Sequence, residues 1–206
     1  CNSLRTMHIP FAGHSTENAI SNFGYMFGTA SVAEQNDYIP TSLKNVYIIG
    51  STNIGSYAFY GCDSLESVIM FPSSNTAGEG IGNYAFAHCD ELKNVVLPTS
   101  LDTMGKRPFA ADKKLTGLQF TAEPLDGNIQ GVTYYGRNFS SENGLIFKLE
   151  NSVRDGIVQC LETRGNPTGI QNTIGSTKVG PNELAGITEI YPEAFMNCKG
   201  IGTMDL

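Results

Sequence analysis

The hydrophobic residues of this chain recur in a short pattern. An apolar residue at one position is followed by a second apolar residue three positions later and a third five positions later. In Leu92-x-x-Val95-x-Leu97 the last two lie two apart, so on a β-strand they share one face and point into a core. Copies of this pattern occur at 4–9, 43–48, 65–70, 92–97 and 201–206. The neighbouring leucines Leu43, Leu65, Leu92 and Leu115 are spaced by 22, 27 and 23 residues, which is the period of stacked repeats. The pattern therefore predicts a parallel sheet built from successive coils.

A second motif follows most of these strands. Residues 54–65 (IGSYAFYGCDSL) and 81–92 (IGNYAFAHCDEL) match at eight positions without a gap, and weaker copies occupy 104–109 and 190–198. We expect Ala-Phe to anchor a short helical turn on the far side of each coil, where glycine lets the chain turn. The residues expected to stack inside the coils are Phe59, Phe86, Phe109 and Phe195, with Cys62 beside Cys89, and the turning glycines are Gly55, Gly82 and Gly105.

These motifs resemble the bacterial cell-surface leucine-rich repeat family often called BspA-like, whose repeat has the form LxxVxIPxSVxxIGxxAFxxC. The match covers 42–120, 184–206 and 1–10. The resemblance implies a mostly β repeat solenoid. It would be a leucine-rich repeat with a parallel sheet on the concave face, short helical turns on the convex side and β-hairpin insertions. It also implies an extracellular or bacterial cell-surface location and a role in adhesion or host interaction.

Two longer segments, 11–42 and 121–183, separate the clear repeats and are interpreted as insertions. Within the second, the apolar runs 145–149 and 157–161 predict a β-hairpin with its turn at Asp155-Gly156. We expect residues 1–206 to form a single solenoid fragment. Because neither end carries a polar cap, we also expect the native protein to continue in both directions.

Composition narrows the function classes. The chain has 40% hydrophobic residues, which excludes disorder, and a net charge of −7, the wrong sign for binding a phosphate backbone. Its apolar runs are only a few residues long, far short of a membrane-spanning helix. We therefore expect no nucleic-acid partner, no direct membrane insertion and a monomeric protein.

The five cysteines allow more than one interpretation. Cys1 fits the repeat spacing, although a lipoprotein would also begin with cysteine. The others could be redox thiols or inter-repeat disulfides, but buried Cys commonly behaves as a small hydrophobe, which favours an inert core column. Cys160 lies outside that column and is expected to be buried on the hairpin, with a free thiol as the alternative.

Catalytic and metal signals are weak. His8, His14 and His88 are scattered and form no zinc-binding pair, and no G-x-S-x-G elbow occurs. The glycines at 78–82 resemble a dinucleotide loop but belong to the turn into the repeat. Asp63 and Asp90 repeat beside the cysteines, where turn capping and a row of catalytic carboxylates are both possible. We expect no cofactor, no metal and no catalytic residue, and we keep an enzyme with a groove against 121–183 as a minor hypothesis.

The sharper functional hypothesis concerns the strand residues that should face outward on the concave side. These candidate partner-binding residues are His8, Tyr47, Ile69, Phe71, Val96 and Gln119. An exposed apolar and aromatic stripe is a candidate interface. The alternatives are that such residues simply favour strands, or that an insertion covers them. We expect a non-catalytic extracellular module of a bacterial surface or secreted protein that binds protein or glycan partners, possibly host-derived, the alternative being a structural spacer in a larger cell-wall-associated protein.

Overall fold

The computed structural model describes residues 2–12, 22–50, 53–72, 80–122, 133–142, 144–161, 178–179, 184–198 and 203–204. The sequence-based predictions for Cys1, Ile201 and Leu206 lie outside the described residues.

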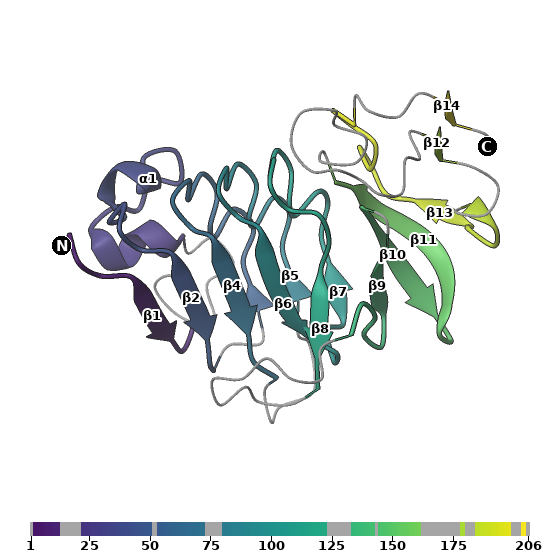
Figure 1. Cartoon of the computed structure of the whole chain (residues 1–206), viewed down its shortest axis with the longest axis horizontal. Coiled ribbons are helices and arrows are strands. Elements are labelled where there is room, and N and C mark those ends of the chain that lie inside the picture. The colour runs from purple at the N-terminus through teal and green to yellow at the C-terminus, as the bar shows by residue number, and fades with distance from the viewer. Residues whose placement is uncertain are drawn as a thin grey trace.

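The coils stack into two parallel sheets. The larger has five strands in the order β1-β2-β4-β6-β8, and the smaller, behind it in Figure 1, has three in the order β3-β5-β7. The larger sheet consists of β1 (Thr6–Ile9), β2 (Asn45–Ile48), β4 (Ser67–Met70), β6 (Asn94–Pro98) and β8 (Gln119–Thr121). The smaller consists of β3 (Asn53–Ile54), β5 (Gly80–Ile81) and β7 (Thr103–Met104). The predicted mostly β repeat with parallel sheets is confirmed.

The core lies between these two sheets and is filled by residues at equivalent repeat positions. Leu43, Leu65, Leu92 and Leu115 are all fully buried. The rings of Phe59 and Phe86 stack at 5.1 Å between centroids, and those of Phe86 and Phe109 at 5.4 Å. The predicted phenylalanine stack is therefore confirmed for these three residues, and Phe23 extends it beyond Phe59 at 4.8 Å.

Phe195 does not join that stack, so this part of the prediction is wrong. It packs instead against a second hydrophobic cluster that contains Leu145, Phe147 and Ile157. The reason is topological: β13 (Glu189–Ile190), which precedes Phe195, pairs with β11 (Val153–Cys160) and not with β7.

The convex segments between the sheets are turns, and the short helices predicted there are not present in the described residues. Each segment has a left-handed residue two positions before its phenylalanine and another two positions after it, which no right-handed helix accommodates. The first set is Tyr57, Tyr84, Arg107 and Glu193, with φ between 42° and 62°, and the second is Gly61, His88, Ala111 and Asn197, with φ between 63° and 68°.

This backbone directs alternate amides to the next coil. The N–H of Phe59 donates to the carbonyl of Ala85 at 2.7 Å, and the N–H of Phe86 donates to Pro108 at 2.8 Å. The amides of the intervening residues close local turns instead. For example, the N–H of Tyr60 donates to the carbonyl of Tyr57. The convex side is thus held by bonds between coils as well as within them.

The glycine column at the start of each turn has a different cause from the predicted one. A Cβ on Gly82 would lie 2.4 Å from the backbone nitrogen of Ser56, and one on Gly105 would lie 2.6 Å from that of Asn83. Neither glycine has a positive φ. Glycine is therefore needed because adjacent coils approach closely, and not because the chain bends there.

Part of the predicted insertion 11–42 packs as helix against the first coils. Its described residues include a 3-10 helix η1 (Phe23–Phe27) and a short helix α1 (Gln35–Tyr38). The buried side chain of Gln35 joins them to the solenoid, because its Oε1 accepts from the N–H of Gly24 and its Nε2 donates to the carbonyl of Tyr60. Within the described residues, no helix has the length and hydrophobicity needed to cross a membrane.

The C-terminal part carries a separate four-stranded sheet with the order β13-β11-β10-β9, where β9 spans Phe139–Glu142 and β10 spans Leu145–Glu150. A separate short parallel pair is formed by β12 (Lys178–Val179) and β14 (Thr203–Met204). The β10–β11 hairpin is present, but the predicted turn at Asp155-Gly156 is wrong. The turn is at Asn151-Ser152, where φ is 49° and 65°. Gly156 lies within β11, opposite Glu189 of β13.

The four described cysteines, Cys62, Cys89, Cys160 and Cys198, are buried thiols. Burial raises the pKa of the Cys62 and Cys89 thiols well above the ordinary value, which keeps them protonated. Cys160 lies on the hairpin, as predicted, and its carbonyl accepts a hydrogen bond from the Cys198 thiol. These residues behave as packing groups.

Candidate binding surface

The candidate concave-face residues form a row across the five-stranded sheet. The strand register places His8 opposite Tyr47, Tyr47 opposite Ile69, Ile69 opposite Val96, and Val96 opposite Gln119. The repeat spacing therefore identified residues that lie side by side.

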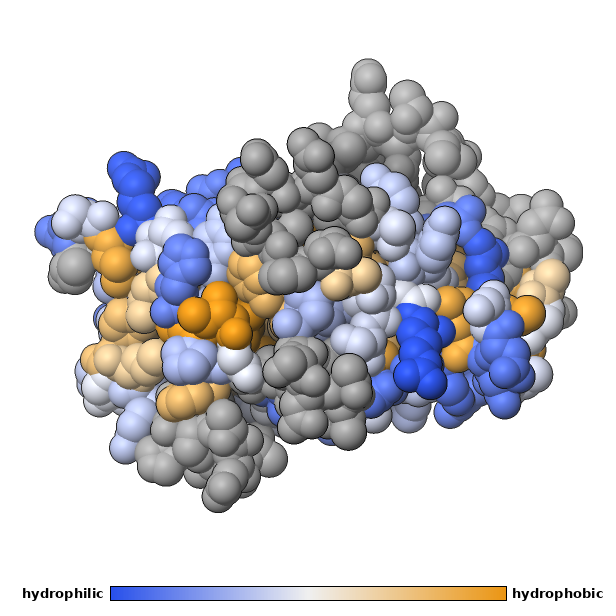
Figure 2. All heavy atoms as spheres, turned by 90° about the horizontal axis from the view of Figure 1, so that it is seen from below, coloured by the Kyte–Doolittle hydropathy of each residue, from blue (hydrophilic) through white to orange (hydrophobic). Residues whose placement is uncertain are grey.

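The row is not, however, a continuous exposed stripe. Ile69 is only 3% exposed and Val96 is fully buried, so the predicted exposure of these two is wrong. They form a small cluster of their own, and Tyr47 and Phe71 pack against it. Seen from below, hydrophobic residues gather in separate patches along the molecule with hydrophilic residues between them (Figure 2).

An aromatic patch remains accessible at the β1 end of the row. The ring of His8 stacks on that of Tyr47 at 4.7 Å, and the Tyr47 ring contacts that of Phe71 at 6.2 Å. His8 is exposed and the other two are half-buried. We call His8, Tyr47 and Phe71 the aromatic patch. Such a preformed cluster offers ring area to a partner at low entropic cost.

A polar row lies beside the first one, two residues earlier on each strand. Thr6, Asn45, Ser67 and Asn94 are in register. The Asn94 amide donates to the Ser67 hydroxyl at 3.1 Å, and the Asn45 amide donates to Thr6 at 3.4 Å. Amide and hydroxyl groups thus border the apolar row.

The five-stranded sheet is continued by a segment from within the predicted insertion 121–183. Phe120 and Thr133 exchange two backbone hydrogen bonds of 2.8 Å in an antiparallel bridge. The antiparallel register of this bridge puts Tyr134 at the position opposite Gln119. Tyr135 forms a further antiparallel bridge with Ser140 of β9. This segment joins the five-stranded sheet to the four-stranded sheet.

A groove of about 1030 Å³ lies between the five-stranded sheet and the four-stranded sheet. Gln119 is the one predicted site residue that lines it. Two exposed tyrosines, Tyr134 at 62% and Tyr135 at 65%, stand at its wall. Its other described lining residues are Lys93, Asn94, Thr116, Gly117, Gly136, Ser140, Ser141, Glu142, Leu149, Ser152 and Arg154.

Sequence reasoning missed the two tyrosines because they lie outside the repeats. The available signal was the pair Tyr134-Tyr135 in the stretch GVTYYGRN, where two adjacent large rings have no strand pattern to bury them. The position of the pair beside Gln119 depends on the Phe120–Thr133 bridge, which no repeat spacing encodes.

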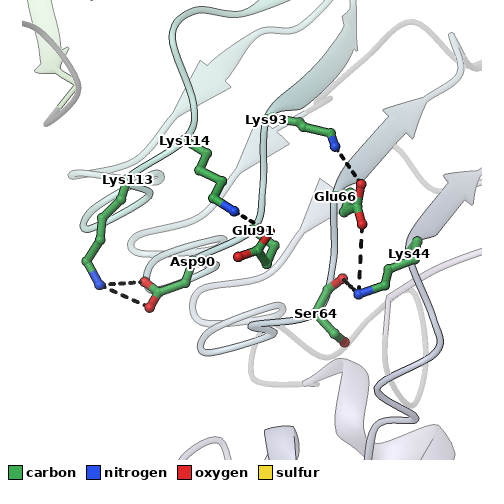
Figure 3. A network of polar contacts seen from close by, with 8 residues as sticks. All are labelled: Lys44, Ser64, Glu66, Asp90, Glu91, Lys93, Lys113 and Lys114. Atoms are coloured by element: carbon green, nitrogen blue, oxygen red, sulfur yellow. Dashed lines mark hydrogen bonds and ion pairs between the residues drawn. The ribbon is translucent and has the colours of Figure 1, made fainter. Parts of the chain in front are cut away.

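Charged side chains at equivalent positions of successive coils form a network near the start of the concave strands (Figure 3). Glu66 accepts a hydrogen bond of 2.6 Å from Lys93 and lies 3.8 Å from Lys44. The Lys93 hydrogen bond is the main cause of the lowered pKa of Glu66. In the next coil, Lys114 pairs with Glu91 and Lys113 with Asp90. Solvent screens exposed pairs of this kind, so each contributes little to stability, and their main effect is to match one coil with the next.

The repeated carboxylates are engaged in structural contacts. Asp63 accepts a hydrogen bond from the Asn36 amide at 2.9 Å, and Asp90 is held by Lys113. Asp112, in the position of a repeat cysteine, accepts a bond from the N–H of Cys89. In the part of the chain that the structure describes, no three His, Cys, Asp or Glu residues are grouped so as to hold a metal ion.

Comparison with known proteins adds the following. A family profile described as "BspA type Leucine rich repeat region (6 copies)" matches residues 34–138. A search of curated proteins finds no match.

Three solved structures are similar. The pneumococcal vaccine antigen PcpA is 17% identical with a TM-score of 0.53, over 83% of this chain and 41% of that one. A leucine-rich repeat protein from Eubacterium ventriosum is 13% identical, with a TM-score of 0.41 over 86% of this chain and 52% of the other. A leucine-rich cell surface protein from Faecalibacterium prausnitzii is 15% identical, with a TM-score of 0.33 over 82% and 62%. Only the first of these scores supports a shared fold, and the chain spans less than two thirds of each protein.

Proposed function

Because this chain belongs to the BspA-type leucine-rich repeat family, we propose that it is a non-catalytic extracellular module of a bacterial surface or secreted protein that binds protein or glycan partners through its concave sheet. The observation that carries the proposal is the aromatic patch, in which His8 stacks on Tyr47 above the Ile69–Val96 cluster. Solvent-accessible aromatic clusters on a rigid sheet are favoured at interfaces.

The rigidity of the patch is part of the argument. Tyr47 lies on β2, between β1 and β4, and its ring packs against a buried apolar pair. A partner that contacts the ring therefore meets a side chain whose rotamer is already restricted, which lowers the entropy cost of binding. The fold similarity to the pneumococcal vaccine antigen PcpA is consistent with an extracellular location.

The proposal is tested with an array of matrix proteins and glycans, probed with the purified chain and with the double variant His8→Asp and Tyr47→Asp. We expect the variant to lose binding while keeping its circular dichroism spectrum. Tyr38→Asp is the matched control, since Tyr38 is 50% exposed on α1, away from the concave sheet. Ile69 is left unchanged because a carboxylate at a buried site would destabilise the fold. Unaltered binding by the double variant would rule out the aromatic patch.

The second candidate is a structural spacer, which the burial of Ile69 and Val96 favours because it reduces the exposed area of the concave row. If the purified chain binds nothing on the array, the result would support the spacer. Antibody labelling of intact cells tests the location, and labelling that requires permeabilised cells would contradict it.

A further inference from the structure

The charged residues among the described lining of the groove beside Gln119 are already paired. Lys93 pairs with Glu66 at 2.6 Å, and Arg154 pairs with Glu142 across the groove's own wall. An anionic ligand would have to displace these carboxylates, and a cationic ligand would have to displace the lysine or arginine. The electrostatics therefore favour an uncharged ligand.

The rest of the lining is poor in aliphatic side chains. Leu149 is the one aliphatic residue among the described lining, whereas several residues, among them Asn94, Gln119 and Ser140, supply hydroxyl or amide groups. A protein partner would need buried apolar or aromatic anchors in a desolvated centre. Hydroxyl and amide groups both donate and accept hydrogen bonds, so they match a ligand whose own groups do the same.

The two tyrosines supply the remaining contact. Each residue is more than 60% exposed, so its ring is in contact with water in the free protein, and covering the ring with a ligand is favourable. The face of an aromatic ring is electronegative and attracts weakly positive C–H groups. A ligand that combines hydroxyl groups on its rim with a flat C–H face satisfies both parts of this lining.

We propose that the groove binds a neutral oligosaccharide, with Tyr134 and Tyr135 against the C–H faces of its sugar rings and with Asn94, Gln119 and Ser140 bonded to its hydroxyls. A volume of about 1030 Å³ is just above the ~300–1,000 Å³ typical of small-molecule sites, which leaves room for more than one sugar unit. This inference rests on the proposed binding function and names the ligand class of one part of the surface.

The experiment uses an array of neutral oligosaccharides built from glucose, galactose, mannose and N-acetylglucosamine, followed by calorimetric titration with the strongest binder. Tyr134→Ala and Tyr135→Ala are each expected to weaken binding about tenfold, the effect of losing one ring contact of ~1.4 kcal/mol. Gln119→Ala is expected to weaken it several-fold. Tyr38→Ala, which removes a tyrosine ring that is 50% exposed elsewhere on the protein, is expected to change nothing. A melting curve for each variant separates lost contact from lost fold.

Binding of a neutral ligand should also be nearly unchanged between about 50 and 500 mM NaCl, whereas ionic contacts are screened over this range. The proposal is overturned if no neutral oligosaccharide binds, if only sulfated or acidic polymers bind, or if binding survives both tyrosine substitutions. The variant His8→Asp with Tyr47→Asp separates the two proposals. If it loses protein binding while no sugar binds the groove, the oligosaccharide inference fails and the binding function stands.

Discussion

The backbone N–H of Phe109 donates a hydrogen bond of 3.1 Å to the side-chain Oε1 of Gln159, fifty residues later in the chain. In the two preceding coils the equivalent N–H groups, of Phe59 and Phe86, donate to the backbone carbonyl of the next coil. A side-chain amide thus takes the place of a further coil. Since Gln159 is fully buried on β11, this bond also fixes the hairpin against the solenoid.

Replacing Gln159 with leucine should therefore expose the Phe109 amide to exchange and reduce stability. A buried N–H left without its acceptor costs about 1–3 kcal/mol. The direct measurement is hydrogen exchange at Phe109, which should accelerate about tenfold or more, while the Phe86 amide, bonded to Pro108, serves as an internal control. Equal protection of both amides in the variant would contradict this role for Gln159.

Gly82→Ala should be strongly destabilising, because the added methyl would lie 2.4 Å from the backbone nitrogen of Ser56 and the coils would have to separate. Overpacking of this kind costs about 1–3 kcal/mol or more. Urea denaturation measures the loss.

Gly117→Ala is the matched control, since its Cβ would meet nothing nearer than the Ser141 hydroxyl at 3.4 Å. We expect that change to stay within about 0.5 kcal/mol. Similar losses at both glycines would mean that close approach is not what selects glycine at position 82.

Ala111→Gly should be neutral or stabilising, although glycine usually weakens a structured segment. Ala111 has φ of 64°, a conformation that costs an L-residue about 1–2 kcal/mol, whereas glycine adopts it freely. The neighbouring Ala110 has an ordinary φ, so Ala110→Gly should destabilise by about 1 kcal/mol. Thermal unfolding of the two variants compares them directly, and a larger loss at 111 than at 110 would refute the strain argument.

Glu193 links the last described coil to the solenoid and should make that contact sensitive to acid. Hydrogen bonds from Lys106 and then Tyr84 hold the pKa of its carboxyl below the ordinary value. Because the folded pKa lies below the unfolded one, the stabilisation is fully present above the unfolded value of about 4.3 and is lost as pH falls through the folded pKa.

Glu193→Gln should accordingly destabilise the protein at neutral pH, and the difference from the unmodified protein should shrink below about pH 4.3. Unfolding midpoints measured from pH 7 to pH 3 test this. In a Lys106→Met background, which removes the main donor, the same substitution should have a smaller effect. A difference that is constant with pH would show that the Glu193 charge is not involved.

The repeats predicted the core but not the turns. Leu92, Phe86 and their equivalents recur at fixed spacing, and identical side chains at identical positions stack, so the sheet and the phenylalanine column followed from the sequence. The left-handed residues did not, because Tyr57, Tyr84 and Arg107 are not residue types that favour positive φ. Their conformation is imposed by hydrogen bonds between coils.

The candidate site was predicted only in part for a similar reason. The strand register has Tyr47 and Gln119 in one row, as predicted, but the alternation does not show that Ile69 and Val96 are buried in a cluster against which Tyr47 and Phe71 pack. Likewise, Tyr134 reaches Gln119 through a single bridge, and Phe195 follows β13 to a different cluster. Local patterns carry no information about such contacts.

The charge pairs between coils bear on how the chain avoids misfolding. Two nearly identical coils, at 54–65 and 81–92, could exchange places during folding, and a slip that omits the middle coil would still align leucine with leucine. Such a slip would bring Lys93 against Lys44, two like charges where the native order has Glu66 between them. The native stacking order is thus distinguished electrostatically from an arrangement that hydrophobic packing alone would tolerate.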